Sequence, residues 1–379
     1  MIESLYFVLE NYPTPDNPEM AFIRPTVTTI ADMGIKCTVF VPQSITHLVK
    51  YKKNKRQYKW YDVTDKGTKI TIIQPCYLSL SNAKIGDFAF SSYFRTKALK
   101  KAMKKNNETP DGVYGHFWHC GIEAAEAIGG VAPVIVVCGE SEIWVNQVCG
   151  KKKTEKWIND IVGLMAVSSK NLVESKEYGL LERKIKNCVI PNAIDSSLFY
   201  QKNRSECRKK LNISQNETIA VFVGAFSERK GVLRVVEAAK QIPDLKLILI
   251  GRGEQTPVSN QIIYSGVLAH EEIVDYLNAA DFFVLPTLAE GCCNAIIEAM
   301  ACGLPVISSD RMFNNDILDE TNSIKIDPMS VSELAMAMEK LTDDKELRER
   351  LAEAALRKAE ELQIEKRARK IVEFIDSVV

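Results

Sequence analysis

The sequence lacks several features that would assign it to a specialised class of protein. The longest apolar run among its 379 residues, Val131–Cys138, is far shorter than the roughly 18 residues that a membrane-spanning helix needs. The chain begins MIESLYFVLENYP without a basic stretch, which predicts no secretory signal. With 46% apolar and 26% charged residues and no long repeat, the composition excludes disordered, collagen-like and low-complexity proteins. We therefore expect a globular, cytoplasmic protein.

The cysteines and charges are ordinary in number but informative in their distribution. The ten cysteines contain no C-x-x-C pair and one adjacent pair, Cys292–Cys293, which indicates reduced thiols and no disulfide framework. The 49 basic residues balance the 49 acidic ones over the whole chain. However, residues 1–200 hold 26 basic and 20 acidic residues, whereas residues 201–379 hold 23 and 29. The two halves are therefore expected to meet different partners.

Short runs rich in Val and Ile alternate with helical stretches along most of the chain. In the first half we expect strands at Leu5–Leu9, Cys37–Val41, Lys69–Gln74, Val113–Gly115, Val134–Val137, Ile161–Val167 and Cys188–Ile190. Helices are expected at Ala21–Met33, Ile85–Lys104, Ile122–Ile128 and Lys170–Tyr178, and Lys50–Lys66 as an irregular segment or a hairpin.

The alternation restarts after Pro191. Strands are expected at Thr218–Gly224, Lys246–Ile250, Ile262–Tyr264, Phe282–Leu285 and Val306–Ile307, with helices from Lys230, Glu271, Asn294 and Val331. Such alternation predicts an α/β fold with parallel sheets covered by helices on both faces. We expect two Rossmann-like domains facing each other across a cleft, residues 1–198 and 199–362. The last helix carries one apolar stripe, made by Ile364, Ala368, Ile371, Ile375 and Val378, which predicts docking on one of the two domains.

The segment Asp281–Pro305 carries two unusual carboxylates. A strand ends near Pro286, a loop holds Glu290 and Gly291, and an apolar helix from Asn294 contains Glu298 as its single charge. A buried carboxylate needs hydrogen-bond donors, which ligand hydroxyls can supply, and Gly291 allows an anion to approach the helix start. Alternatively, Glu298 pairs with a distant Lys or Arg and Glu290 complements the helix dipole.

Two further signals follow neighbouring strands. Arg229 and Lys230 stand at a helix start after Gly224, where cations are unfavourable unless an anion such as a diphosphate lies between them and the helix. An exposed basic pair on a turn is the alternative. Gly251-Arg252-Gly253 follows the next strand, and all three signals fall at the carboxyl edge of one sheet, where ligands bind in open α/β folds.

These residues carry a family resemblance. The block YSGVLAHEEIVDYLNAADFFVLPTLAEGCCNAIIEAMACGLPVISSD, with ERKG upstream, resembles the retaining glycosyltransferases of family 4, which have the GT-B fold. Glu290 and Glu298 match the E-x7-E pair of that family, and Pro191–Asp195 and Asp327-Pro328 match further motifs. The resemblance covers the second domain strongly and the first one loosely. It also implies that the final helix, residues 363–379, crosses back to the first domain.

The resemblance implies a role for each matching residue. Arg229 and Lys230 would hold the donor diphosphate, and Glu298 would bind the ribose hydroxyls. Glu290 and the backbone of Gly291, Cys292, Cys293 and Asn294 would contact the transferred sugar. The nucleobase would lie against Val267, Leu268 and Arg252. Gly224 would also contact the donor. Transfer would retain the configuration of the sugar. It would need no bound metal and no cofactor, because the nucleotide-sugar is itself a substrate.

The first domain departs from the family pattern in two places. The family commonly has a glycine pair after the first strand, but here Pro15–Met20 contains none. A histidine often ends the strand equivalent to Val134–Val137, but here Cys138 stands in its place. We hypothesise that His116 or His119 faces the donor sugar and acts in catalysis instead. A half-buried packing role is the alternative, and a zinc site with Cys120 is a weaker one.

Two basic clusters suggest a surface for the acceptor side. Lysines in Lys50–Lys59 interleave with tyrosines and Trp60, and the lysines of Lys97–Lys105 share one helix face with Phe90, Tyr93 and Phe94. Lysines flanked by aromatic residues suit an anionic membrane surface, whereas nothing resembles a nucleic-acid-binding module. A solvated helix face is the alternative. We therefore expect a protein that is cytoplasmic or peripheral on the inner face of the cell membrane.

Together, the sequence predicts a hexosyltransferase that moves a sugar from a UDP- or GDP-sugar to a lipid-linked acceptor or a surface glycan, as in polysaccharide biosynthesis. Three alternatives remain open at this point. One is a nucleotide-sugar epimerase of the same fold, and another is a catalytically weakened glycan-binding or partner subunit. The third is a two-domain solute-binding protein, which the reduced cysteines and the missing signal disfavour.

Overall fold

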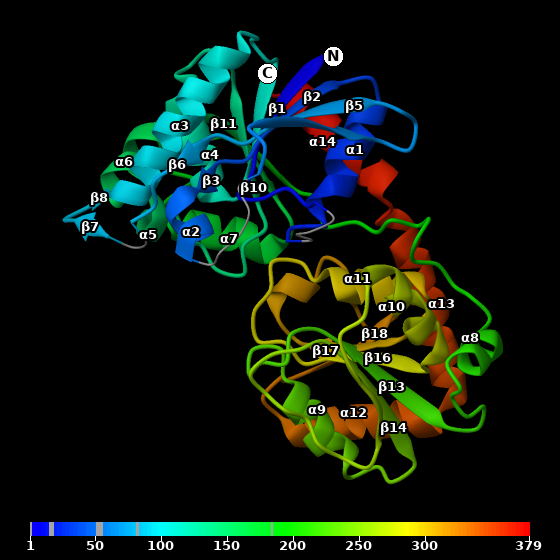
Figure 1. Ribbon diagram of the computed structural model, residues 1–379. Helices are drawn as coiled ribbons and strands as arrows, with labels where there is room; N and C mark the ends of the chain where they lie inside the picture. The colour runs from blue at the N-terminus through cyan, green and yellow to red at the C-terminus, as the bar shows by residue number, and fades with distance from the viewer. Residues whose placement is uncertain (1, 15–18, 51–55, 81–82, 183–184) are drawn as a thin grey trace. The chain divides into compact units, whose positions relative to one another are not determined.

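The chain divides into two compact units. The structure, a computed structural model, describes all 379 residues except 1, 15–18, 51–55, 81–82 and 183–184 (Figure 1). One unit comprises Met1–Ile190 with Glu365–Val379, and the other comprises Pro191–Ile364. The second unit begins a few residues before the expected position 199. Asn192 and Ile194 belong to it, because Asn192 bonds to Cys292 and Ile194 pairs with Gln363. Within the described residues no helix is both long and apolar enough to cross a bilayer.

The first unit is built on a sheet of order β12-β11-β10-β9-β1-β2-β5-β4. Every neighbouring pair is parallel except β4 with β5. The strands are β1 (Ser4–Val8), β2 (Lys36–Phe40), β4 (Lys59–Val63), β5 (Lys69–Ile73), β9 (Gly112–His116), β10 (Val134–Cys138), β11 (Ile161–Ala166) and β12 (Lys186–Val189). The seven expected strands are confirmed to within two residues. The segment described as irregular or a hairpin contains β4, which forms an antiparallel edge.

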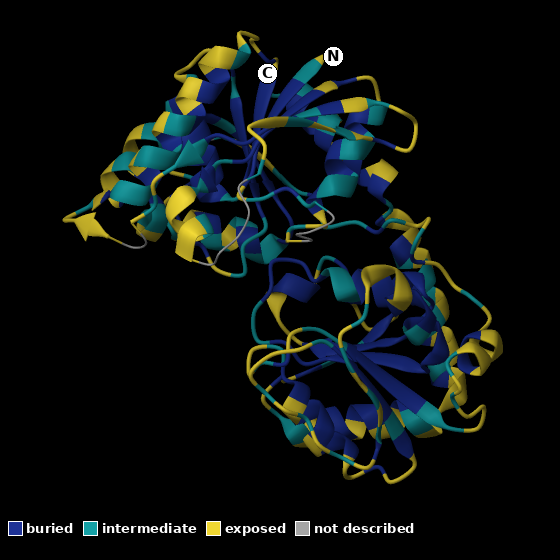
Figure 2. Ribbon diagram, in the orientation of Figure 1, coloured by how far each residue is buried: buried dark blue, intermediate teal, exposed yellow. Residues whose placement is uncertain are grey.

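Helices cover both faces of this sheet (Figures 1 and 2). They are α1 (Ile23–Asp32), α2 (Ile45–Lys50), α3 (Phe90–Asn106), α4 (Trp118–Ile128), α5 (Val145–Cys149), α6 (Lys151–Trp157) and α7 (Ser169–Glu177). The expectation that a helix starts at Ile85 is wrong. Residues 84–89 form a hairpin of β7 (Lys84–Ile85) and β8 (Phe88–Ala89), turned by Gly86 at φ +56°. The next helix begins earlier than expected, at Trp118 instead of Ile122.

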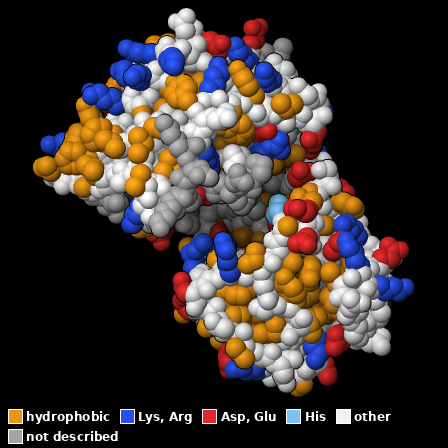
Figure 3. All heavy atoms as spheres, in the orientation of Figure 1, with side chains coloured by type: hydrophobic (Ala, Val, Ile, Leu, Met, Phe, Trp, Pro, Cys, Tyr) orange, Lys and Arg blue, Asp and Glu red, His pale blue; other side chains and the backbone are white. Residues whose placement is uncertain are grey.

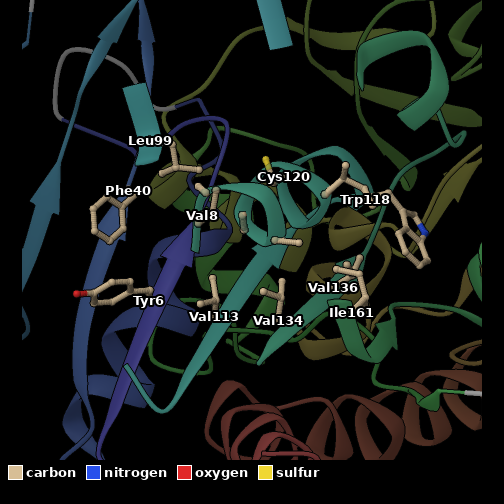
Figure 4. Close-up of a cluster of buried hydrophobic side chains, with 14 of the residues drawn as sticks. Tyr6, Val8, Phe40, Leu99, Val113, Trp118, Cys120, Val134, Val136 and Ile161 are labelled. Carbon is tan, nitrogen blue, oxygen red and sulfur yellow. The ribbon is translucent and has the colours of Figure 1, made fainter. Parts of the chain in front are cut away.

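The core of the first unit lies between this sheet and helices α3 and α4. Tyr6, Phe40, Val113 and Trp118 belong to one buried apolar cluster (Figure 4). Helix α4 approaches the strands so closely that a Cβ on Gly115 would lie 2.6 Å from the Cα of Gly121. Only glycine allows this contact, which brings the start of α4 close to the ends of β9 and β10.

The second unit has a six-stranded parallel sheet of order β15-β14-β13-β16-β17-β18. Its strands are β13 (Thr218–Val223), β14 (Leu245–Ile250), β15 (Ile262–Gly266), β16 (Phe282–Leu285), β17 (Val306–Ser309) and β18 (Ser323–Ile326). Its helices are α8 (Arg204–Lys210), α9 (Val232–Ala239), α10 (His270–Ala279), α11 (Asn294–Ala301), α12 (Val331–Asp343) and α13 (Lys345–Glu361). The five expected strands and four expected helices are confirmed, whereas β18, α8 and α13 are additions to the prediction.

The last helix, α14 (Ile364–Asp376), packs on the first unit, as the apolar stripe and the family resemblance predict. Four stripe residues are buried, namely Ile364, Ala368, Ile371 and Ile375. The buried Arg367 donates to Thr26 Oγ1 of α1 over 2.8 Å, and Asp376 Oδ1 accepts from the backbone N–H of Ile2 over 2.6 Å. The final helix therefore completes the unit in which the chain begins.

The charged helix α8 is held to its sheet by one carboxylate, Asp281, which precedes β16. Asp281 accepts from Arg208 at 2.7 Å, from Arg204 at 2.8 Å and from the backbone N–H of Ile219 at 2.8 Å. The Arg208 side chain is 4% exposed and that of Arg204 is 50% exposed. Arg208 also donates to the carbonyls of Ala279 and Gln215, so it is both more buried and more strongly bonded than Arg204.

This pair predicts a large difference in stability between two equivalent substitutions. Arg208→Ala should lower the free energy of unfolding of the second unit by about 3 kcal/mol or more, because it removes a partner from a buried ion pair. Arg204→Ala should cost about 1 kcal/mol or less, because that pair is solvated. Urea denaturation of both variants measures the difference, and equal losses would contradict it.

Candidate functional site

The second unit gathers its polar residues at the carboxyl edge of the sheet. β13 lies between β14 and β16, so the loops that follow these strands leave the sheet in opposite directions at this point. Such a switch of strand order opens a crevice for a ligand in parallel α/β sheets. The loop after β13 carries Arg229 and Lys230, and the loop after β16 carries Glu290. The structure therefore brings together residues about sixty positions apart.

Glu290 is the centre of this arrangement. Its Oε1 lies 2.5 Å from Lys230 Nζ and 3.2 Å from Arg229 Nη1, and it accepts from Thr287 Oγ1 over 2.8 Å. Arg229 also donates to the backbone carbonyl of Ala289 over 2.6 Å. Glu290 therefore binds the two cations and does more than complement a helix dipole. Arg229 remains 45% exposed, so part of its guanidinium is accessible to a ligand.

Lys230 is held in its charged form. Burial alone would lower the pKa of its ammonium, but the carboxylate of Glu290 lies beside it and the net pKa is raised. Burial raises the pKa of the Cys293 thiol, whose sulfur lies 3.9 Å from Lys230 Nζ. A neutral thiol does not compete for the ammonium, so the charge of Lys230 is available to Glu290 and to an anion.

Glycines bring the loops after β13 and β14 into contact. A Cβ on Gly251 would lie 1.9 Å from the carbonyl oxygen of Gly224, and a Cβ on Gly253 would lie 2.1 Å from that of Phe226. Phe226 N–H donates to the carbonyl of Arg252 over 2.9 Å, so the two loops are bonded through their backbones. The Arg252 side chain is exposed beside this contact. The G-x-G sequence therefore serves loop packing, which leaves Arg252 free to reach a ligand.

Glu298 has a partner that the sequence did not predict. Its Oε1 lies 3.1 Å from Nε2 of His270, the first residue of α10, whose ring packs against Phe199 with centroids 4.9 Å apart. The partner is therefore an exposed histidine and neither a lysine nor an arginine. The hydrogen bond to Glu298 raises the pKa of His270. His270 directly follows the Val267–Ala269 loop, in which Val267 is 59% exposed.

The loop between Glu290 and α11 is fixed through its backbone. Asn192 Nδ2 donates to the carbonyl of Cys292 and to Asn294 Oδ1, both over 2.9 Å. Gly291, Cys292 and Cys293 are buried and Asn294 is half-buried at the start of α11. Since Asn192 belongs to the P-N-A-I-D segment, that motif positions the loop between the two glutamates.

The first unit has a separate polar cluster at its own carboxyl edge. β1 lies between β2 and β9, which makes the ends of β1 and β9 the switch point of this sheet. His119 Nε2 lies 3.0 Å from Oε1 of Glu10, which follows β1. Burial alone would raise the pKa of Glu10, but the hydrogen bond to His119 lowers it to about 2. Glu10 is therefore an ionised carboxylate, 46% exposed, which the sequence analysis did not identify.

The two predicted histidines lie in different surroundings. His116 is 2% exposed and packs among Phe22, Tyr114 and Phe117, and burial lowers its pKa to about 3. His116 is therefore neutral and enclosed, whereas His119 contacts a solvent-accessible carboxylate. Among the described residues, no group of three or more His, Cys, Asp or Glu side chains is arranged to hold a metal ion, and this includes His116, His119 and Cys120.

Glu140 lies two residues after Cys138, which stands where the family pattern often has a histidine. Cys138, which ends β10, is fully buried, and burial raises the pKa of its thiol. Two residues later, Glu140 Oε1 accepts the backbone N–H of Trp118 over 2.7 Å, at the start of α4. Burial raises the pKa of Glu140. The loop Pro15–Pro18, where glycines were expected, lies outside the described residues.

Comparison with known proteins gives a family match for most of the second unit. Residues 203–358 match the family glycosyl transferases group 1. Over 347 residues the chain is 27% identical to a candidate teichuronic acid biosynthesis glycosyltransferase, TuaC, of Bacillus subtilis, covering 88% of both chains. Over 197 residues it is 32% identical to the UDP-Gal:alpha-D-GlcNAc-diphosphoundecaprenol alpha-1,3-galactosyltransferase of Escherichia coli, covering 46% of this chain and 50% of that protein.

Solved structures show the same fold over the whole chain. Sucrose-phosphate synthase from Thermosynechococcus elongatus superposes with a TM-score of 0.77 at 16% identity, covering 99% of this chain and 98% of that one. Anabaena HepE in complex with UDP and glucose gives 0.71 at 16% identity, covering 99% and 100%. The expected GT-B fold, with parallel sheets in two domains, is therefore confirmed.

The pair of His270 and Glu298 predicts a pH-dependent stability. Because the folded protein raises the pKa of His270, the pair stabilises it fully below the ordinary value of 6.5 and less as pH rises through the folded pKa. His270→Gln should therefore destabilise the protein more at pH 5.5 than at pH 8.5, as measured by urea denaturation. In Glu298→Gln, NMR titration should find the pKa of His270 back near 6.5. An unchanged pKa in that variant would contradict the assignment.

Proposed function

We propose that the chain transfers a sugar from a nucleotide-sugar to a lipid-linked or surface-glycan acceptor, because residues 203–358 match the family glycosyl transferases group 1 and the chain has the GT-B fold. We further propose the retaining, metal-independent chemistry of family 4, with a UDP- or GDP-sugar as donor. The observation that carries the proposal is the contact of Glu290 with Lys230 and Arg229, at the sheet edge that also carries Glu298.

In this proposal each residue of the second unit meets one part of the donor. Lys230 and Arg229 bind the diphosphate, which displaces part of their contact with Glu290 and frees its carboxylate to meet the sugar. The second oxygen of Glu298 accepts from the ribose hydroxyls while His270 holds the first. The exposed Val267 and Leu268 backbone and the Arg252 side chain border the base, and the fixed backbone of Gly291–Asn294 approaches the sugar.

The proposed chemistry depends on position and charge. As the bond between sugar and diphosphate breaks, negative charge grows on the leaving phosphate. Lys230, whose pKa is raised, and Arg229, which the carbonyl of Ala289 holds in place, contact the diphosphate before this charge develops, so they stabilise it without a further rearrangement. Preorganisation of this kind lowers the barrier more than flexible surface charges do.

The cation pair can be tested against a lysine of the adjacent helix. Lys230→Ala should lower kcat for transfer or donor hydrolysis by roughly 10²–10³, the usual loss when one preorganised charge is removed. Lys240→Ala is the control, because Lys240 follows the last residue of α9, is 55% exposed and pairs with Glu237. The rates are measured with a panel of UDP-, GDP- and ADP-sugars. Equal rates for both variants would reject the proposed site.

The same panel separates the proposal from its alternatives. Slow hydrolysis of one donor identifies an enzyme and its sugar. A weakened glycan-binding subunit hydrolyses none, and an epimerase converts the donor sugar without releasing it to an acceptor. Support for transfer to a lipid-linked or surface-glycan acceptor comes from the names of the relatives, which include teichuronic acid biosynthesis and a diphosphoundecaprenol acceptor. The excess of basic residues in positions 1–200 is consistent with an anionic acceptor of this kind.

We assign the acceptor side of the reaction to Glu10 and His119. The ionised Glu10 carboxylate can accept a hydrogen bond from an acceptor hydroxyl, and His119 fixes its orientation from the other side. This differs from the hypothesis that His116 or His119 faces the donor sugar, which stays a prediction, because it places His119 on the acceptor side. His116 is enclosed by aromatic rings and acts through packing.

Two histidine variants test this assignment. His119→Ala should lower kcat by roughly 10²-fold, as expected for a side chain that assists proton transfer or its orientation. His116→Ala should chiefly lower the free energy of unfolding, because it leaves a cavity among buried rings. Turnover and urea denaturation are measured for both. Unchanged turnover in His119→Ala would exclude the residue from the reaction.

A further inference from the structure

The β7–β8 hairpin carries large apolar side chains into solvent. Ile85 is 73% exposed and Phe88 is 46% exposed, and Leu80 and Leu78 before the hairpin are 49% and 54% exposed. Figure 3 shows this region as a continuous hydrophobic patch at the left end of the molecule, where Figure 1 labels β7 and β8. Single exposed apolar residues are ordinary, but a contiguous patch indicates a binding surface.

The hairpin is fixed in this exposed position. Asp87, in its turn, accepts the backbone N–H groups of Lys151 and Lys152 over 2.7 and 2.6 Å, which caps the start of α6. These two hydrogen bonds lower the pKa of Asp87, so its carboxylate stays ionised. A Cβ on Gly150 would lie 2.2 Å from the carbonyl oxygen of Asp87, so the turn is pressed against the unit. The apolar tip is therefore presented by a rigid support.

Lysines continue directly from the apolar tip. The ring of Phe88 packs on that of Tyr93 with centroids 5.3 Å apart, and Lys97 Nζ lies 5.3 Å above the Tyr93 ring. Lys100, Lys101 and Lys104 follow along the exposed side of α3, while the other side is buried. We call this surface the hairpin face, defined by Ile85, Phe88, Tyr93, Lys84, Lys97 and Lys152.

We infer that the hairpin face docks on an anionic phospholipid bilayer, with Ile85 and Phe88 inserted among the headgroups and the lysines bound to lipid phosphates. An apolar wedge surrounded by lysines matches the boundary between acyl chains and anionic headgroups. Tyr93, between the two, is the aromatic type that favours this boundary. The inference rests on the proposed function, because an acceptor carried on a lipid has to be met at a membrane.

Other occupants fit the hairpin face less well. A second copy of the chain would bring the same lysines against each other, and lysine is depleted at protein interfaces. Nucleic acid would satisfy the lysines but would leave Ile85 and Phe88 in water. In the other predicted basic segment, Lys50–Lys59, residues 51–55 lie outside the described ones, and Tyr58 is 40% exposed. Arg56 is engaged within the unit, donating to Asn11 and Tyr12.

Vesicle co-sedimentation of the full chain tests the inference. Wild-type protein should bind vesicles that mix phosphatidylglycerol with phosphatidylcholine and should not bind phosphatidylcholine alone. Ile85→Ser with Phe88→Ser should weaken binding roughly tenfold or more, because the wedge loses its apolar area. Ile85→Ser alone guards against misfolding, since this side chain is the more exposed. Lys97→Gln and Lys100→Gln should each weaken binding roughly fivefold and reduce its sensitivity to salt.

A matched control and a second readout complete the test. Val258→Ser removes an apolar side chain that is 77% exposed in the second unit, so it should leave vesicle binding unchanged. Equal binding by wild type and the hairpin variants, or binding that does not depend on anionic lipid, would overturn the inference. So would a concentration-dependent dimer that the hairpin variants abolish. Donor hydrolysis separates this inference from the proposed function, because the hairpin variants should retain it, whereas Lys230→Ala should lose it and still bind vesicles.

Discussion

A carboxylate buried in an apolar α/β fold needs hydrogen-bond donors. In both units this requirement determines how neighbouring elements are held together. Asp281 is satisfied by two arginines and a backbone N–H, and it thereby ties a highly charged helix to the second sheet. Glu123 in α4 is satisfied in the same way by Arg95, which donates to both of its oxygens over 2.6 and 2.8 Å. Because removing one partner from such a pair costs several times more than a surface contact is worth, these networks fix the positions of neighbouring elements.

The carboxylates of the candidate site meet the same requirement, and each has one partner that is exposed. Glu290 and Glu298 are also supplied with donors, but their partners Arg229 and His270 stay exposed at the sheet edge. A ligand could replace or share these contacts, which it could not do at Glu123, whose partner Arg95 is 15% exposed. At Asp281 the partner Arg204 is also exposed, but the buried Arg208 and a backbone N–H still hold that carboxylate.

Much of the fold was predictable because buried parallel strands are continuous apolar runs, and the strands of both sheets were recognised on that basis. Two of the missed elements, β18 and α8, lack a clear apolar pattern. β18 (SIKI) alternates at a sheet edge, and α8 (RSECRKK) has no apolar stripe because an ion pair holds it in place. The prediction of a helix from Ile85 was wrong because Gly86 and Asp87 form a turn. That turn is stabilised by hydrogen bonds from backbone N–H groups at the start of α6. The positions of Arg229, Lys230 and Glu290 could be predicted because their loops directly follow recognisable strands. Glu10 and His270 could be found only by knowing which strand ends are neighbours in the sheet.

The return of α14 has a consequence for how the protein is made. The backbone N–H of Ile2 is bonded to Asp376, and Arg367 donates to Thr26, so the first unit is assembled from two separate stretches of chain. The unit of Pro191–Ile364 is one continuous stretch and lies between them in the sequence. Residues 365–379 are therefore translated only after the whole second unit, and the first unit cannot bury the surface that α14 covers until then.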